Sequence, residues 1–135
     1  MRFGACSGVA IHIIHPAGFA LTDPGLKRAG LDYLDRAALV EHSDWSAFMS
    51  WRSGNSHRLI VLSTRASDRY FDFSFRPGDV LLLGRESAGL PETIHNEADA
   101  RLAIPQTEGT RSLNVALAGA IVASEALRQT GGFPD

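Results

Sequence analysis

Four short apolar segments constrain the fold of this chain more than any other feature of its sequence. They occupy residues 9–14, 59–62, 80–83 and 101–104, and they consist mainly of valine, isoleucine and leucine. Turn-forming residues follow them, for example Pro16, Gly84 and Pro105. Segments of this length and composition are typical of strands that are buried on both faces of a sheet.

Helical patterns alternate with these segments. Asp23 and Pro24 suit the cap and first position of a helix that stops at Gly30, and further helices are expected over residues 44–51 and 113–128. Apolar strands that alternate with helices predict an α/β fold with a parallel sheet flanked by helices. Ligands of such sheets bind beyond the carboxyl ends of the strands, so we expect a site at the turns after Leu62, Leu83 and Ile104.

The bulk properties indicate a single globular domain over residues 1–135. The longest apolar stretch, residues 115–123, is too short to cross a bilayer, so no membrane partner is expected. The first residues lack the apolar core of a leader peptide, and a cytoplasmic location is the expectation.

A lone cysteine and scattered histidines give no metal-binding pattern. Cys6 cannot form an internal disulfide and is expected to be a small buried residue. The histidines show no ligand spacing, so no metal is predicted; they are His12, His15, His42, His57 and His95.

Charge neither requires nor excludes a nucleic-acid partner. The formal net charge is −2, whereas RNA-binding domains are usually basic, yet twelve of the thirteen cations are arginines. Residues 65–76 mix arginine with aromatic side chains, which suits RNA binding. The same segment also fits an amphipathic strand that buries Phe71, Phe73 and Phe75, and both interpretations stay open.

Two segments carry groups suited to chemistry. Glu86 follows the third apolar segment and Gly84, so its carboxylate can accept hydrogen bonds at the end of a strand; a tight turn with a solvated charge pair is the alternative. Downstream, Ser112 suits the cap of the last helix, and Asn114 adds a side-chain amide to the free amide groups there.

Together these segments resemble a known family. The sequence Gly-Arg-Glu-Ser-Ala-Gly-Leu-Pro at residues 84–91, followed by Ile-Pro at 104–105 and Arg-Ser-Leu-Asn-Val at 111–115, is similar to the second and third motifs of SpoU-class RNA ribose methyltransferases of the SPOUT superfamily. Residues 15–19 and 26–33 add similarity to the small single-domain branch that methylates the wobble nucleotide of tRNA.

The resemblance implies a deep trefoil knot in the carboxyl-terminal part of the sheet. It also implies that S-adenosylmethionine binds there and leaves as S-adenosylhomocysteine, and that two chains form a homodimer that binds a tRNA anticodon stem-loop. The cofactor-binding positions that match are Leu62, Ser63, Thr64, Gly84, Glu86, Ile104, Ser112 and Leu113. Independently, the apolar run at residues 115–123 predicts a helix that is buried on more than one side.

The implied reaction moves a methyl group to a ribose 2′-hydroxyl, with Arg2, Glu86 and Asn114 as the catalytic candidates. A guanidinium does not deprotonate in proteins, so Arg2 is expected to hold a phosphate and stabilise developing negative charge rather than act as a base. Glu86 and Asn114 are expected to orient the ribose.

This chain departs from the family pattern at its start. Members begin with a strand and an asparagine-containing loop before the motif-one arginine, whereas here that arginine matches the second residue. We therefore expect a chain that lacks the family's first strand. Methylation of another RNA, such as ribosomal RNA, and a non-catalytic knotted dimer that binds cofactor or RNA are the alternative functions.

Overall fold

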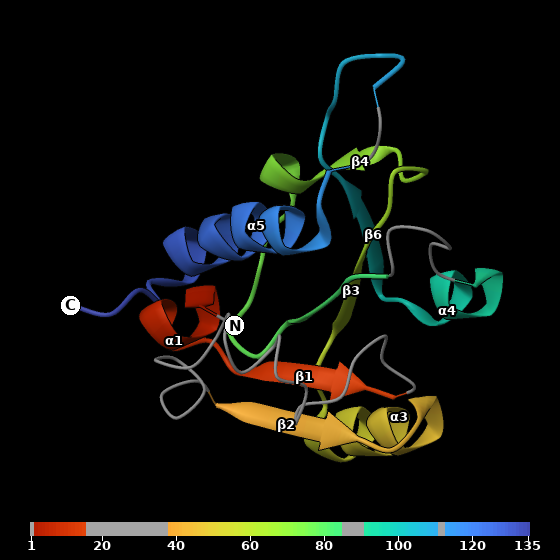
Figure 1. Ribbon diagram of the computed structural model, residues 1–135, viewed down its shortest axis with the longest axis vertical. Helices are drawn as coiled ribbons and strands as arrows, with labels where there is room; N and C mark the ends of the chain where they lie inside the picture. Colours follow the sequence, from red (N-terminus) through yellow and green to blue (C-terminus); the bar gives the residue numbers. More distant parts are fainter. Residues whose placement is uncertain (1, 16–37, 85–90, 111–112) are drawn as a thin grey trace, which may run out of the picture. The chain divides into compact units, whose positions relative to one another are not determined.

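The computed structural model describes residues 2–15, 38–84, 91–110 and 113–135. The chain divides into two compact units, one of residues 1–56 with 133–135 and the other of residues 57–132 (Figure 1). No helix in the described ranges is long and apolar enough to cross a membrane. The helix expected at residues 24–30 lies outside the described residues.

The first unit contains a helix and a parallel strand pair. Helix α1 (Arg2–Ser7) ends at Gly8, whose φ of +77° suits glycine. Strand β1 (Ile11–Ile14) pairs with β2 (Leu39–His42), starting at Ile11 opposite Leu39. The strand predicted at residues 9–14 is confirmed, and β2 was not foreseen.

Helix α3 (Trp45–Asn55) confirms the helix expected from residue 44, with an extra turn at its end. Asp44 caps it: its side chain accepts a hydrogen bond of 2.8 Å from the Ala47 amide. Phe48 is 1% exposed, and its ring centroid lies 5.2 Å from that of Trp45. The aromatic face predicted for this helix is therefore the face that is buried.

Two histidines from the paired strands meet beside this helix. His12 Nδ1 lies 2.8 Å from His42 Nε2, and the two rings are stacked at 5.1 Å. The Trp51 ring lies 4.5 Å from the His12 ring. Because one imidazole nitrogen must donate and the other accept, the two facing nitrogens share one proton.

The second unit is built on a sheet of four parallel strands, in the order β4-β6-β3-β5. The strands are β3 (Leu59–Leu62), β4 (Asp68–Arg69), β5 (Val80–Leu82) and β6 (Ala100–Ala103). Three consecutive residues of β3, Leu59 to Val61, are 0% exposed, so both faces of this strand are covered. The predicted α/β class with a parallel sheet is confirmed.

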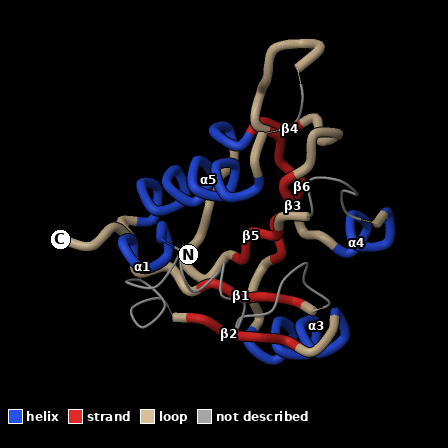
Figure 2. The backbone as a smooth tube through the Cα atoms, viewed as in Figure 1, coloured by secondary structure: helices blue, strands red, loops and turns tan. Residues whose placement is uncertain are grey.

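Helix α5 (Val115–Thr130) covers one face of this sheet (Figure 2). Its Val122 is buried in a core with Ile60, Leu102 and Phe75. The Gln129 side chain at its last turn accepts a hydrogen bond from the Phe75 amide and donates one to the Phe73 carbonyl, both at 2.8 Å. Helix α5 thus holds the segment before β5 through polar as well as apolar contacts.

The amphipathic strand expected around Phe71, Phe73 and Phe75 is wrong. Residues Tyr70–Asp72 form a 3₁₀ turn, η1, and only Phe75 of the three is buried. The turn breaks the two-residue alternation, so Phe71 stays 46% exposed with the Arg69 guanidinium 5.0 Å from its ring centroid.

Two further expectations are corrected. Asn114, not Ser112, caps α5: its Oδ1 accepts hydrogen bonds from the amides of Ala116 at 2.9 Å and Leu117 at 3.2 Å. Cys6 is exposed, because α1 buries its opposite side through Gly4 and Ser7.

The trefoil knot stays a prediction, since residues 85–90 and 111–112 lie outside the described residues. The single-domain interpretation also stays a prediction.

Candidate functional site

The carboxyl ends of three strands meet at one edge of the second unit's sheet. Leu62 ends β3, Gly84 follows β5 by two residues, and Ile104 comes directly after β6. Because β3 is parallel to both β5 and β6, these positions share an edge. This is the edge at which parallel α/β sheets bind ligands.

The turn after β3 is held by its own hydrogen bonds. The Ser63 amide donates to the Leu102 carbonyl at 2.9 Å, which extends the pairing with β6 by one residue. The Ser63 hydroxyl accepts from the Arg65 amide at 3.2 Å, and the Ser63 carbonyl accepts from the Ala66 amide at 3.2 Å. Thr64 is thereby left exposed at the tip of an ordered turn.

The amino end of α5 lies close to this edge. A Cβ atom on Gly119 would stand 3.3 Å from Leu83 Cδ2, so the helix passes close to the end of β5, and a larger residue here would require the Leu83 side chain to shift. Asn114 precedes Gly119 by five residues, which is about 7.5 Å along a helix axis. Helix α5 therefore approaches Leu83, the residue before Gly84, and the place of Leu113 and Asn114 in the site stays a prediction.

The capping role of Asn114 limits what else its side chain can do. Its Oδ1 is occupied by two backbone amides, which leaves the Nδ2 group as the part able to contact a substrate. Asn114 is exposed, so that group is accessible.

The other candidates are not brought together by the described residues. Glu86 and Ser112 lie outside them. Arg2 begins α1 in the first unit, and its side chain is likewise outside the description. The structure places residues 62–64, Gly84 and Ile104 at one edge of the sheet, and the candidate site as a whole stays a prediction.

A polar pocket beside this edge was missed by the sequence analysis. It has a volume of about 180 Å³ and is lined by Arg65, Ala66, Glu92, His95, Asn96 and Arg101. Arg65 follows the Ser63–Thr64 turn, Glu92 to Asn96 belong to helix α4 (Glu92–Glu97), and Arg101 lies within β6. The sequence did not indicate Arg101 as a binding residue, because an arginine inside an apolar segment only weakens the pattern that predicts a strand.

The strongest charge pairs of the second unit lie away from the pocket. Arg58 donates to both oxygens of Asp79, at 2.8 and 2.6 Å, and this pairing raises the pKa of the guanidinium above its ordinary value. On α5, hydrogen bonds from Arg128 and Gln129 lower the pKa of Glu125 to about 2. Among the described residues, no group of three histidine, cysteine or acidic side chains could hold a metal ion.

The fold defines an α/β protein with a candidate ligand site at the carboxyl edge of a parallel sheet. Comparison with known proteins makes this more specific: residues 1–124 match the SpoU rRNA Methylase family. The chain belongs to this family.

Similar proteins from two organisms align with nearly the whole chain. A protein of Ancylobacter novellus named tRNA (cytidine(34)-2′-O)-methyltransferase is 56% identical over 132 residues, which are 98% of this chain and 84% of the relative. A protein of the same name from Escherichia coli K12 is 38% identical, over 97% of this chain and 83% of its own length.

Solved structures agree with the fold. One described as "Structural insights into the 2-OH methylation of C/U34 on tRNA" has a TM-score of 0.85 at 37% identity, covering 94% of this chain and 86% of the other. The SpoU methyltransferase AviRb from Streptomyces viridochromogenes, in complex with the cofactor AdoMet, has a TM-score of 0.83 at 26% identity, covering 95% of this chain and 53% of the other.

Proposed function

We propose that this protein transfers a methyl group from S-adenosylmethionine to the ribose 2′-hydroxyl of the wobble nucleotide, cytidine or uridine, of tRNA. The observation that carries the proposal is the 56% identity, over 98% of the chain, to a relative named for this reaction at cytidine 34. The likeness to a solved structure described for C/U34 methylation supports the same substrate.

The edge residues fit S-adenosylmethionine. Gly84 and Ile104 follow their strands without a backbone hydrogen bond to any other described residue, so their amide and carbonyl groups are available to a ligand. Half-buried Leu62 and Leu113 offer apolar surface to an adenosine, and the Ser63 hydroxyl keeps its proton for donation. When bound, the cofactor supplies an electrophilic methyl group on a sulfonium.

The chain's own residues then have to position the ribose, whose 2′-oxygen would gain the methyl group as the sulfur–methyl bond breaks and would lose its proton to solvent. In this proposal Asn114 Nδ2 donates a hydrogen bond to the ribose, while its Oδ1 stays on the helix amides. Glu86 accepts a hydrogen bond from the ribose or cofactor. Arg2 holds a phosphate and stabilises the charge that develops on the 2′-oxygen.

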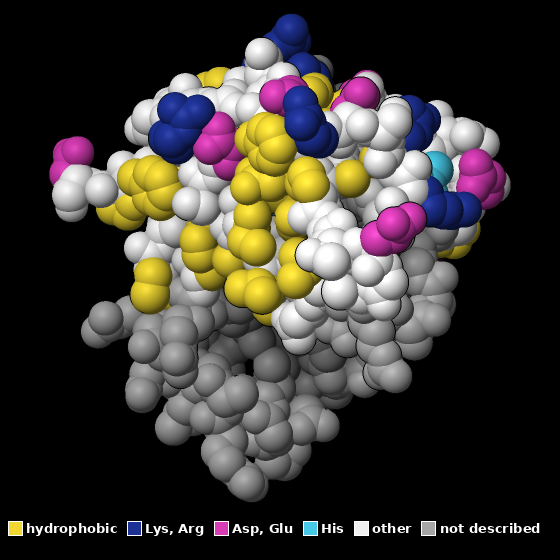
Figure 3. Space-filling model, turned by 90° about the horizontal axis from the view of Figure 1, so that it is seen from above, with side chains coloured by type: hydrophobic (Ala, Val, Ile, Leu, Met, Phe, Trp, Pro, Cys, Tyr) yellow, Lys and Arg dark blue, Asp and Glu magenta, His cyan; other side chains and the backbone are white. Residues whose placement is uncertain are grey.

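The active form in this proposal is a homodimer. Leu117 on the first turn of α5 is 52% exposed, although the run at residues 115–123 is apolar throughout. Figure 3 shows hydrophobic side chains gathered between charged ones on the face of the molecule seen from above. A second copy covering Leu117 would give this helix the two-sided burial that its composition predicts.

Transfer of a tritiated methyl group from S-adenosylmethionine to tRNA tests the proposal. We expect incorporation into an anticodon stem-loop with cytidine or uridine at the wobble position, and none into the same RNA with a 2′-deoxy nucleotide there. Incorporation into ribosomal RNA alone would support the rRNA alternative. Cofactor binding without transfer to any RNA would support the non-catalytic dimer.

Variants at Asn114 separate chemistry from folding. Serine also caps helices but has no amide group, so Asn114→Ser is expected to keep the stability of α5 and lose about 100-fold in turnover. An Asn114→Ser protein with unchanged turnover would remove this residue from the proposed site. Arg2→Ala and Glu86→Gln are expected to lower turnover in the same assay.

A further inference from the structure

We propose that the pocket between the β3 turn and α4 binds a backbone phosphate of the RNA substrate, outside the ribose and cofactor site. Arg65 and Arg101 would hold the phosphate, and Asn96 would add a hydrogen bond. This inference rests on the proposed function for the nature of the RNA.

The pocket gathers positive charge on an otherwise acidic chain. Its lining has two arginines and one carboxylate, Glu92, whereas the whole chain has a net charge of −2. The register of the sheet places Arg101 opposite Val61 on one face, while Leu102 points into the α5 core. Arg101 is therefore on the face that α4 approaches, and His95 of α4 is only 8% exposed there.

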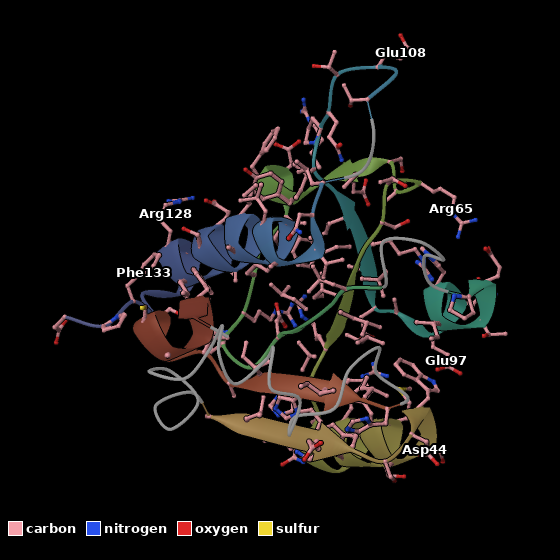
Figure 4. The ribbon with its side chains drawn as sticks, viewed as in Figure 1. Asp44, Arg65, Glu97, Glu108, Arg128 and Phe133 are labelled. Atoms are coloured by element: carbon pink, nitrogen blue, oxygen red, sulfur yellow. The ribbon has the colours of Figure 1, made fainter. Side chains whose placement is uncertain are left out.

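Arg65 is held weakly and can change partner. Its ion pair with Glu92 measures 3.5 Å, with the two side chains 65% and 72% exposed. Exposed pairs at this distance contribute little, so a phosphate can compete for the guanidinium. In Figure 4 the Arg65 side chain extends from the β3 turn toward the α4 side of the sheet.

Three other arginines of this unit are bound more tightly. Arg58, Arg69 and Arg128 form ion pairs of 2.6, 2.8 and 2.6 Å with Asp79, Asp72 and Glu125. The Arg101 side chain, by contrast, forms no ion pair or hydrogen bond with any residue of the described ranges, although its backbone pairs within the sheet. The two guanidinium groups that face the pocket are thus available to an anion, and arginine is well suited to phosphate.

The position of the pocket favours an RNA phosphate over a free one. Arg65 lies one residue beyond the Ser63–Thr64 turn of the cofactor edge, so an RNA whose ribose reaches that edge passes close to the pocket. The alternative anion is the carboxylate of the cofactor's methionine part. If the pocket binds an RNA phosphate, removing its arginines should change the affinity for tRNA; if it binds the cofactor carboxylate, the affinity for S-adenosylmethionine should change instead.

The test measures the affinity of the full-length protein for unmodified tRNA and, separately, for S-adenosylmethionine. Arg65→Gln and Arg101→Gln are each expected to weaken tRNA binding about five- to eightfold at 0.1 M salt, because each phosphate contact contributes a slope of about 0.7 to 0.9 to log K against log salt. The slope of log K against log salt should fall by about 0.7 to 0.9 in each variant. Affinity for S-adenosylmethionine should not change.

Three further variants sharpen the result. Glu92→Gln removes the competing carboxylate and is expected to tighten tRNA binding. Arg76→Gln is the matched control: Arg76 is exposed and precedes β5, so it lies near the amino edge of the sheet, and its loss should leave the affinity unchanged. Arg101→Lys keeps the charge and should retain most of the affinity if Arg101→Gln acts through the phosphate rather than through folding.

Unchanged tRNA affinity and salt slope in both arginine variants would overturn the inference while leaving the methyltransferase proposal intact. A loss of S-adenosylmethionine affinity with unchanged tRNA affinity would assign the pocket to the cofactor carboxylate and also overturn it. A wild-type protein that binds no RNA would overturn this inference together with the proposed function.

Discussion

The Gln129 side chain stabilises the fold by forming hydrogen bonds with two backbone groups of a segment that is distant in the sequence, before β5. It accepts from the Phe75 amide and donates to the Phe73 carbonyl, each at 2.8 Å. Phe75 is only 7% exposed, so water reaches this backbone poorly. Removing the side chain leaves a donor and an acceptor without their partner.

The magnitude follows from these two losses. A buried backbone group left unsatisfied costs about 1–3 kcal/mol, while alanine regains a few tenths through its higher helix propensity. Both hydrogen bonds are only partly buried, so each loss is expected at about 1–2 kcal/mol, and Gln129→Ala should lower the free energy of unfolding by about 2–4 kcal/mol. For 135 residues, 1 kcal/mol corresponds to about 3.5 °C in Tm, so we expect a drop of about 7–14 °C.

Urea denaturation at one fixed protein concentration measures the loss. Gln129→Met keeps the length of the side chain without its hydrogen bonds and should lose nearly as much, which separates hydrogen bonding from packing. Gln106→Ala, in an exposed loop, is the control and should stay within about 0.5 kcal/mol of the wild type. Hydrogen exchange at the Phe75 amide should accelerate in Gln129→Met.

A loss below 0.5 kcal/mol in both Gln129 variants, with the Phe75 amide still protected, would refute the reasoning. It would mean that water or a shifted backbone replaces the two hydrogen bonds.

Three further predictions concern α5. Asn114→Ala should cost about 1 kcal/mol through loss of the cap, whereas Asn114→Ser should cost less than half of that in urea denaturation; equal losses would show that the cap is not what stabilises this end. Val122→Ala should cost about 2 kcal/mol in the same measurement, because Val122 is 0% exposed in the core; a change within 0.5 kcal/mol would mean that the core closes around the cavity. Arg128→Gln should raise the pKa of Glu125 from about 2 toward the ordinary glutamate range, followed by carboxyl NMR. Since the folded pKa is depressed, this contact stabilises the protein above the ordinary glutamate pKa and the effect is lost as the pH falls toward 2; an unchanged pKa in the variant would assign the shift to another cause.

The strands that could be predicted are those whose burial is visible in the sequence. β3 matches residues 59–62 because a strand covered on both faces must be apolar throughout. β4 and β2 could not be predicted in this way. Asp68 and Arg69 form a two-residue edge strand with exposed side chains, and the last residues of β2 are glutamate and histidine. Such strands form because they pair with a neighbouring strand, β1 for β2 and β6 for β4, and no local sequence pattern predicts them.

In the candidate site, too, some features could be predicted from the sequence and others could not. Residues 62–64, Gly84 and Ile104 could be predicted because strand ends in a parallel sheet share an edge, whatever the details of packing. The cap of α5 could not, because Ser112 and Asn114 are both good capping residues and the choice depends on where the loop before them turns into the helix. The polar pocket depends on α4 approaching one face of β6, which is a tertiary contact.

Net charge neither requires nor excludes a nucleic-acid partner, and the reason is physical. A sum over all side chains counts Arg58, Arg69 and Arg128 equally with Arg65 and Arg101, although the first three are paired with carboxylates at 2.6–2.8 Å. The opposite charges of such a pair largely cancel, so the pair contributes little to the electrostatic potential at a distance. A chain with a negative net charge can therefore still present a local basic site. Because the pocket charge is set by two arginines against one carboxylate, Glu92→Gln should strengthen RNA binding even though it changes the net charge by only one unit.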